Sequence, residues 1–140
     1  MTSALPLIVD AIVAWLGIGM LALVPGRRGF TGHALFVAGA LIGLAIAIVA
    51  LTAVGAAVQT MVLPLGLPDL PFHLRLDALS AFFLVLLGGA AAGISVFSAG
   101  YFRASENASP RLLCLQYHVF LAAMALVLVA DDAYLFMVAW

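Results

Sequence analysis

The sequence predicts an all-α protein, a polytopic bundle of transmembrane helices, and two observations carry that prediction. Of the 140 residues, 67% are hydrophobic and only 8% are charged, whereas a soluble domain typically carries about 25% charged residues. So few charges cannot cover a globular surface in water, and the solvent must therefore be lipid. In addition, four continuous apolar stretches reach or approach the length of about 20 residues that a helix needs to cross a bilayer.

The predicted helices span residues 5–24, 34–58, 78–102 and 112–130, and a fifth begins at residue 133 and runs to residue 140. Asp10 interrupts the first segment, and the second segment holds no charge at all. No segment alternates apolar and polar residues as a barrel strand would, so each is interpreted as a helix. The connectors carry turn-forming residues: "VPGRRGFTGH", "QTMVLPLGLPDLPFHLRLD", "FRASENASPR" and "ADDA".

The arginines predict the orientation of the chain in the membrane. Arg27 and Arg28 lie in the first connector, Arg103 and Arg111 flank the third, and only Arg75 lies in the second. Positive residues gather on the cytoplasmic side of membrane proteins, so the first and third connectors are predicted to be cytoplasmic. The N-terminus and the second connector are then predicted to lie outside. The sequence thus indicates a multi-pass protein of the inner (plasma) membrane.

The composition argues against several classes of site. A net charge of −1 without a basic stripe argues against binding of nucleic acid. The single cysteine, Cys114, excludes an internal disulfide and a cysteine-rich metal site. There is no P-loop, GxGxxG, histidine pair or CxxC, so we expect no metal, no cofactor and no catalytic residue. The start "MTSALPLIVD" lacks the basic region of a cleavable signal peptide, so the first segment is expected to be retained.

Three ionisable residues in or beside the membrane segments are candidates for a role in ion movement, because such residues are costly in lipid. Asp77 opens the third segment, where it could alternatively cap the helix and pair with Arg75. His118 lies in the fourth segment on the same face as Cys114 and is interpreted as either a packing residue or a proton relay. Asp10, near the outer end of the first segment, is either an interfacial acid or a transport residue.

Small residues predict where the helices pack, because they let helices approach closely in lipid. Gly39 and Gly43 lie four residues apart in the second segment, and Gly89 and Gly93 repeat this spacing in the third. A stripe of small or polar residues with spacings of three and four also follows the third segment: Asp77, Ser80, Leu84, Gly88, Ala91, Ser95 and Ser98. These patterns indicate a helical bundle. The aspartates at 131 and 132 are expected to cap the fifth helix.

The last ten residues, "DDAYLFMVAW", begin a fifth segment that supplies only eight apolar or aromatic residues. At a rise of 1.5 Å per residue they reach about 12 Å, less than half of an apolar core of about 30 Å. We therefore expect the chain to be the N-terminal portion of a larger membrane protein. A complete four-helix membrane scaffold or anchor is the alternative.

The stretch "FHLRLDALSAFFLVLLGGAAAGISVFSAGYF", residues 72–102, resembles a known family. It is similar to the L-x-L-D-x-L-S-x-x-F opening and the Ser-x-x-Tyr-like ending of antiporter-like subunits. These are large membrane subunits of respiratory complex I, of Mrp-type antiporters and of membrane-bound hydrogenases. Within the family, "RLDALSAFFL" looks most like the large membrane subunit of hydrogenase-4 and formate hydrogenlyase. The order of segments over all 140 residues agrees with this resemblance.

The resemblance implies part of a proton-translocating subunit that couples electron transfer in other subunits to ion movement, as in hydrogenase-4, formate hydrogenlyase or NADH:quinone oxidoreductase. Its implied partners are the lipid bilayer and other membrane subunits. Asp77 matches the aspartate of the motif, and Trp140 matches a tryptophan that precedes a translocation glutamate in the family. Since that glutamate lies beyond residue 140, these residues alone are not expected to translocate ions. An Mrp-type sodium/proton antiporter subunit is the alternative.

Overall fold

The computed structural model describes residues 3–24, 30–67, 69–104 and 110–140. The helices in these ranges are α1 (Ala4–Leu21), α2 (Phe36–Ala53), α3 (Ala78–Ala104), α4 (Pro110–Val129) and α5 (Ala133–Ala139). A π-helical turn, η1 (Phe30–Leu35), leads into α2, and strands β1 (Gln59–Leu67) and β2 (Leu70–Leu76) lie between α2 and α3. Four helices are long and apolar enough to cross a membrane. The predicted all-α bundle with four long helices is thereby confirmed.

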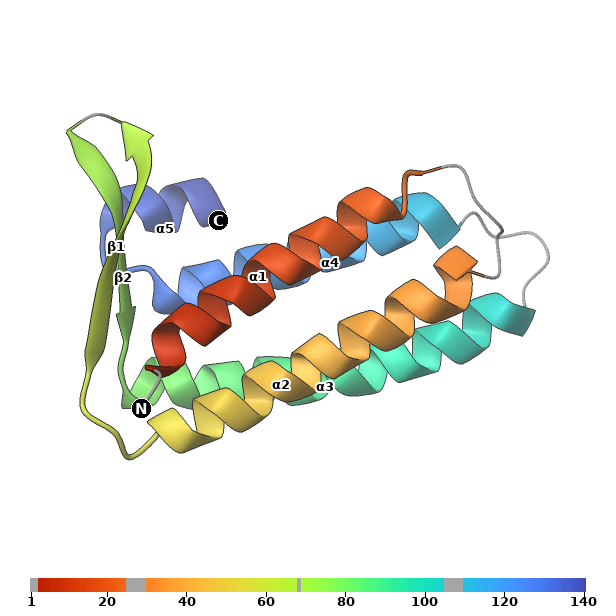
Figure 1. The fold of residues 1–140 in the computed structure, drawn as a ribbon, viewed down its shortest axis with the longest axis horizontal. Helices are drawn as coiled ribbons and strands as arrows, with labels where there is room; N and C mark the ends of the chain where they lie inside the picture. Colours follow the sequence, from red (N-terminus) through yellow and green to blue (C-terminus); the bar gives the residue numbers. More distant parts are fainter. Residues whose placement is uncertain (1–2, 25–29, 68, 105–109) are drawn as a thin grey trace.

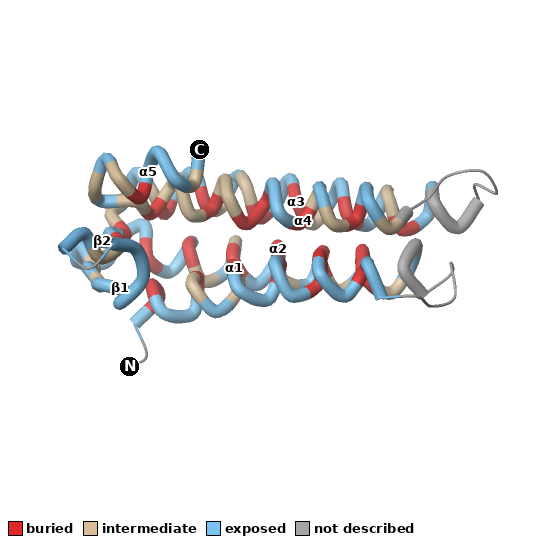
Figure 2. Tube along the Cα trace, turned by 90° about the horizontal axis from the view of Figure 1, so that it is seen from above, coloured by how far each residue is buried: buried red, intermediate tan, exposed pale blue. Residues whose placement is uncertain are grey.

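The four long helices form an antiparallel bundle of two layers (Figures 1 and 2). α1 packs along α4 and α2 packs along α3. Seen from above, α1 and α2 form one layer, and α3, α4 and α5 form the other. The β-hairpin lies across one end of the bundle, beside the start of α5. That end is the side predicted to be outside, but Arg27 and Arg28 lie outside the described residues, and the orientation stays a prediction.

The core lies where the helices of the bundle face one another. Its fully buried members come from all four long helices and include Ile8, Ile46, Leu84 and Val129. The helix surfaces that point away from the core are also apolar, and Phe97 is 72% exposed. A helix that is hydrophobic all round suits a lipid environment.

The paired helices α2 and α3 approach closely at Gly43 and Gly88. A Cβ atom placed on Gly43 would lie 2.9 Å from the carbonyl oxygen of Gly88. In turn, a Cβ atom on Gly88 would lie 2.5 Å from the carbonyl oxygen of Gly43. This separation is possible because neither residue has a side chain. Both glycines belong to the small-residue patterns from which helix packing was predicted.

The glycines at 89 and 93 do not make the contact predicted for them within this chain. Both lie on the exposed face of α3. Apart from the adjacent residues and the backbone of the helix itself, no atom of the described residues lies within 4 Å of a Cβ placed on Gly89 or Gly93. The reason is that the buried face of α3 is formed by Leu84, Gly88 and Ala91. Gly89 and Gly93 lie on a neighbouring face of the helix, which points away from the core.

The hairpin takes the place of the turn-rich connector expected after the second helix. β1 and β2 pair antiparallel, with a shift of register between Leu63 and Gly66. Gly66 has a φ of 112°, a conformation that favours glycine. In β2 the side chain of Leu74 is buried whereas His73 and Arg75 are exposed, the alternation expected of a strand with one face on a core.

Candidate functional site

The polar side chains inside the bundle gather between the α1–α4 pair and the α2–α3 pair. We call this interface the seam, and it is formed by Trp15, Gly39, Ser95, Tyr117 and His118. Ser95 and His118 are completely buried. Trp15 of α1 contacts α2, His118 of α4 contacts α2, and Tyr117 of α4 contacts α3. These contacts therefore join the two helix pairs.

His118 is held in one orientation by its own helix. Its Nδ1 lies 2.7 Å from the carbonyl oxygen of Cys114, and since a carbonyl can only accept, Nδ1 carries the donated hydrogen. In the neutral ring, Nε2 is then an acceptor. Nε2 is the one buried side-chain nitrogen or oxygen without a hydrogen-bond partner in the part of the chain that the structure describes. A Cβ atom placed on Gly39 would overlap Nε2, so this nitrogen packs directly against the α2 backbone.

Gly39 joins three helices at this point. The indole Nε1 of Trp15, on α1, donates a hydrogen bond of 3.2 Å to the carbonyl oxygen of Gly39. The same glycine provides the surface against which His118 packs. The ring of Phe36, also on α2, lies with its centroid 5.7 Å from that of His118. The absence of a side chain at residue 39 therefore lets α1, α2 and α4 meet.

Tyr117 joins α4 to α3 beside the histidine. Its hydroxyl donates a hydrogen bond of 3.1 Å to the carbonyl oxygen of Ala91. A phenol has one hydrogen to donate, so the hydroxyl of Ser95, 3.0 Å away, is the donor to Tyr117. The two hydroxyl groups are satisfied by this arrangement, in contrast to the unpaired nitrogen of His118.

The chemistry available at the seam follows from these contacts. Its groups are neutral hydroxyl, indole, imidazole and backbone carbonyl groups, and among the described residues Nε2 of His118 is the buried side-chain nitrogen or oxygen atom that makes no hydrogen bond. Such a nitrogen can accept a hydrogen bond or a proton. Among the residues described, no three potential ligands from histidine, cysteine, aspartate or glutamate lie together.

Replacing Tyr117 by phenylalanine is expected to lower the free energy of unfolding by about 1–3 kcal/mol, because the buried Ser95 loses its acceptor. The Ser95→Ala variant removes the donor instead and is expected to cost less, since Tyr117 keeps its bond to Ala91. Both values can be measured by denaturant titration of the chain in mixed micelles. Equal costs for the two variants would contradict the hydrogen-bond directions given above.

Charged residues gather at the hairpin end of the bundle, in what we call the hairpin cluster: His73, Arg75, Asp77, Asp131 and Asp132. The Asp132 carboxylate accepts hydrogen bonds from the backbone N–H of Leu135, at 2.7 Å, and of His73, at 2.9 Å. The backbone N–H of Asp131 donates to the carbonyl oxygen of His73, at 3.0 Å. Arg75 lies 3.8 Å from both Asp77 and Asp131. The cluster therefore ties β2 to the start of α5.

Hydrogen bonds lower the pKa of two carboxyl groups in this cluster. The backbone N–H of Ser80 donates to Asp77 at 2.8 Å, and this bond, more than the nearby Arg75, holds the pKa of Asp77 below its ordinary value. The pKa of Asp132 is likewise lowered, first by the N–H of Leu135 and then by that of His73. Each carboxylate is thus stabilised in its charged form by a helix N-terminus.

The fixed position of α5 is expected to be lost in acid. A carboxyl group whose pKa is lowered by folding stabilises the folded state above its ordinary pKa of about 4, and this stabilisation disappears as the pH falls through the lowered value. We expect the Leu135 amide to lose its protection from hydrogen exchange, measured against the intrinsic rate at each pH, in that range. The Asp132→Asn variant can still cap the helix but does not titrate, so its protection should not change with pH. The same loss of protection in this variant would contradict the assignment.

The three sequence-predicted ionisable residues lie in three different places. Asp77 caps α3 in the hairpin cluster, in agreement with the capping interpretation, and Ser80 supplies the N–H that it binds. His118 lies in the seam, and Asp10 is exposed on α1. The structure does not assign an ion-transport role to any of them. Trp15 and Tyr117 of the seam and His73 of the hairpin cluster were not predicted as site residues. Each has a polar group within a mostly apolar stretch of the sequence, which is the one local sign that it needs a hydrogen-bond partner.

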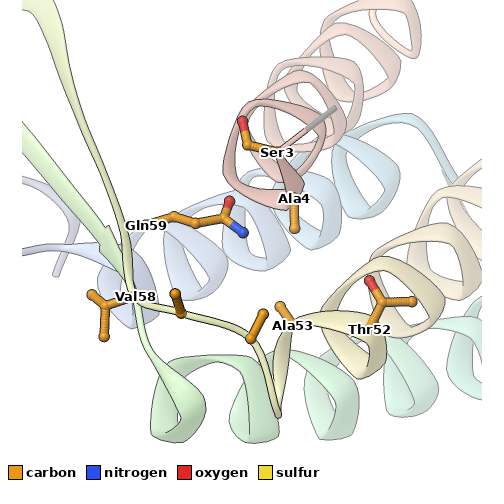
Figure 3. Close-up of a pocket in the computed structure, with 8 residues that line it drawn as sticks. Ser3, Ala4, Thr52, Ala53, Val58 and Gln59 are labelled. Carbon is orange, nitrogen blue, oxygen red and sulfur yellow. The ribbon is translucent and has the colours of Figure 1, made fainter. Parts of the chain in front are cut away.

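A pocket of about 420 Å³ lies between the start of α1, the end of α2 and the start of β1 (Figure 3). Gln59 lines it, and the Oε1 of this residue accepts a hydrogen bond of 2.9 Å from the N–H of Leu5. The hydroxyl of Thr52 donates to its own helix at Val49. The remaining lining is mostly alanine, without a titratable side chain: Ser3, Ala4, Ala53, Ala56, Ala57 and Val58. The seam is therefore the better candidate site.

Comparison with known proteins adds one relationship. No family model matches the sequence. Over 78 residues the chain is 35% identical to NADH-quinone oxidoreductase subunit L of Mycobacterium tuberculosis, in both strain CDC 1551 / Oshkosh and strain ATCC 25618 / H37Rv. The matched residues are 56% of this chain but only 12% of each relative, so the chain spans a small part of the relatives that it matches.

Proposed function

We propose that this chain is part of a proton-translocating, antiporter-like membrane subunit of an oxidoreductase complex of the NADH:quinone oxidoreductase type. The observation that carries the proposal is the 35% identity over 78 residues with NADH-quinone oxidoreductase subunit L. The four helices of membrane-spanning length support it, because a subunit that moves protons across a bilayer has to cross that bilayer. Electron transfer would take place in partner subunits.

The identity of the complex is the finer part of the proposal. "RLDALSAFFL", residues 75–84, favours a complex of the hydrogenase-4 or formate hydrogenlyase kind in the inner membrane. The similarity to subunit L supports antiporter-like subunits in general, because these subunits resemble one another in the order of their membrane segments. We propose the hydrogenase kind as the first complex to look for, and the quinone-reducing kind as the second.

We also propose that residues 1–140 form the N-terminal membrane portion of such a subunit. The match covers only 12% of each relative, which supports a piece of a larger subunit, and the order of the apolar segments favours its N-terminal end. Reading the source gene beyond codon 140 tests this directly. A glutamate codon followed by further apolar segments with lysines is the expected result, whereas a stop codon would favour a four-helix scaffold.

Partner subunits provide the test of function. A tagged copy expressed from its own locus should be solubilised in mild detergent, purified and examined by mass spectrometry. Copurification of hydrogenase or quinone-reductase subunits is the expected result, and the set recovered identifies the complex. Antiporter subunits without redox partners would favour the Mrp alternative. Recovery of the chain alone, while an equally tagged subunit of a known respiratory complex retains its partners, would overturn the proposal.

A further inference from the structure

We propose that Nε2 of His118 is a proton-binding site inside the bundle, and that a proton bound there loosens the contact between α2 and α4. This inference deepens the proposed function and rests on it for its role in proton movement. The binding of the proton itself is a property of the described helices, and it can be measured without any partner subunit.

The first argument is the unpaired acceptor. Nδ1 donates its hydrogen to the carbonyl oxygen of Cys114, at 2.7 Å. The lone pair of Nε2 is then available to accept a hydrogen bond or a proton. This nitrogen is fully buried and has no partner in the described part of the chain. Buried polar atoms are nearly always paired, and ionisable side chains inside membrane bundles commonly serve ion movement.

The second argument is the contact at Gly39. Because a Cβ atom there would overlap Nε2, the gap between the ring and the α2 backbone is too small for a water molecule. The carbonyl oxygen of Gly39 already accepts the indole N–H of Trp15. A proton added to Nε2 would therefore point at the α2 backbone, where the described residues offer it no hydrogen-bond acceptor. The resulting imidazolium needs water or another acceptor, and either one requires α2 to move away from α4.

The third argument is the neutrality of the surroundings. The titratable groups next to His118 are Cys114 and Tyr117, both on its own helix. The residues that meet it from the other helices cannot titrate: Gly19 on α1, and Phe36 and Gly39 on α2. Of the described side-chain carboxylates, three belong to the hairpin cluster, and the other two, Asp10 and Asp69, are exposed. His33 of η1 is exposed as well, and Arg111 lies two turns before His118 on α4. In the described residues no carboxylate faces the ring, so a bound proton leaves a net positive charge that favours hydration.

The chain contains its own probe of this contact. It has two tryptophans, so the Trp140→Phe variant retains only Trp15, whose indole bonds to Gly39 across the seam. We expect the emission of Trp15 to change in a single one-proton transition when this variant is acidified in phosphatidylcholine nanodiscs. The transition should persist in His33→Gln and His73→Gln and be lost in His118→Gln. Circular dichroism should show that helix content is retained throughout.

Nitrogen NMR of the unmutated chain, labelled with ¹⁵N-histidine, gives a second readout that does not depend on any variant folding. At neutral pH, one histidine should show a protonated Nδ1 and a bare Nε2, and acid should protonate Nε2 while the helices remain. The proposal is overturned if Nε2 carries the hydrogen at neutral pH, if the Trp15 transition survives in His118→Gln, or if it coincides with loss of helix. Failure of the copurification would leave this titration unchanged, so the two proposals fail separately.

Discussion

Replacing Gly88 by alanine is expected to lower the free energy of unfolding by about 1–3 kcal/mol, the usual cost of overfilling a tightly packed core. A methyl group at this position would lie 2.5 Å from the carbonyl oxygen of Gly43 and 2.8 Å from the backbone nitrogen of Ala47. Both of these atoms belong to the α2 backbone, so a change of side-chain rotamer cannot relieve the overlap. The two helices have to separate, and the packing on both sides of the contact is lost with them.

A matched control lies one residue further along the same helix. Gly89→Ala adds the same methyl group where the described structure leaves open space, and it should be neutral or slightly stabilising, because alanine is the better helix former. Unfolding of both variants by sodium dodecyl sulfate in mixed micelles, followed by circular dichroism, gives the comparison. If the two alanine variants lower the free energy of unfolding equally, the close approach of α2 and α3 at Gly88 is contradicted.

Gly39→Ala is expected to destabilise the bundle by a similar amount, about 1–3 kcal/mol, but through a side chain. The added methyl group would overlap Nε2 of His118. The imidazole cannot turn aside without breaking its 2.7 Å hydrogen bond to Cys114. The methyl group therefore either displaces the ring or pushes α2 outward, which also strains the bond from Trp15 to the carbonyl of residue 39.

The partner of this overlap can be identified by a double-mutant cycle. His118→Ala opens the space that the methyl group needs, so Gly39→Ala should cost less in that background, with a coupling of about 1 kcal/mol or more. Gly17→Ala, at a site with nothing within 4 Å in the described structure, serves as the control for adding a methyl group to a helix. Additive costs at residues 39 and 118 would contradict the contact.

The helices of this fold can be predicted from the sequence because the segments are long. An uninterrupted apolar run of 20 residues has few interpretations other than a membrane helix, and the structure has a helix in each. Partners within the bundle are harder to predict. Helices that are apolar all round carry little directional signal, and only close contacts such as Gly43 with Gly88 reveal a face. The pairing of α1 with α4 could not have been predicted.

The hairpin was missed although a signal was present. The stretch "FHLRL", residues 72–76, alternates apolar and polar residues as a strand does, but the prolines and glycine around it read as turns. The seam was predicted only in part. His118 stood out because it is ionisable, whereas Trp15 and Gly39 are ordinary membrane residues until the fold brings them together. Their role depends on a contact between segments 24 residues apart, which no local pattern encodes.

The pairing of α1 with α4 sets the order in which the protein can assemble as it is synthesised. α1 is made before α2, α3 and α4, yet the helix that it packs along begins only at Pro110, so until then α2 is the one long helix of the bundle that can cover part of its inner face. α2 and α3 are joined by the β-hairpin and can pack against each other before α4 exists. The bridge between Leu74 and Ala130 can form only afterwards. We therefore expect nascent chains stalled before α4 to hold a compact α2–α3 pair and an α1 that other membrane proteins can still contact.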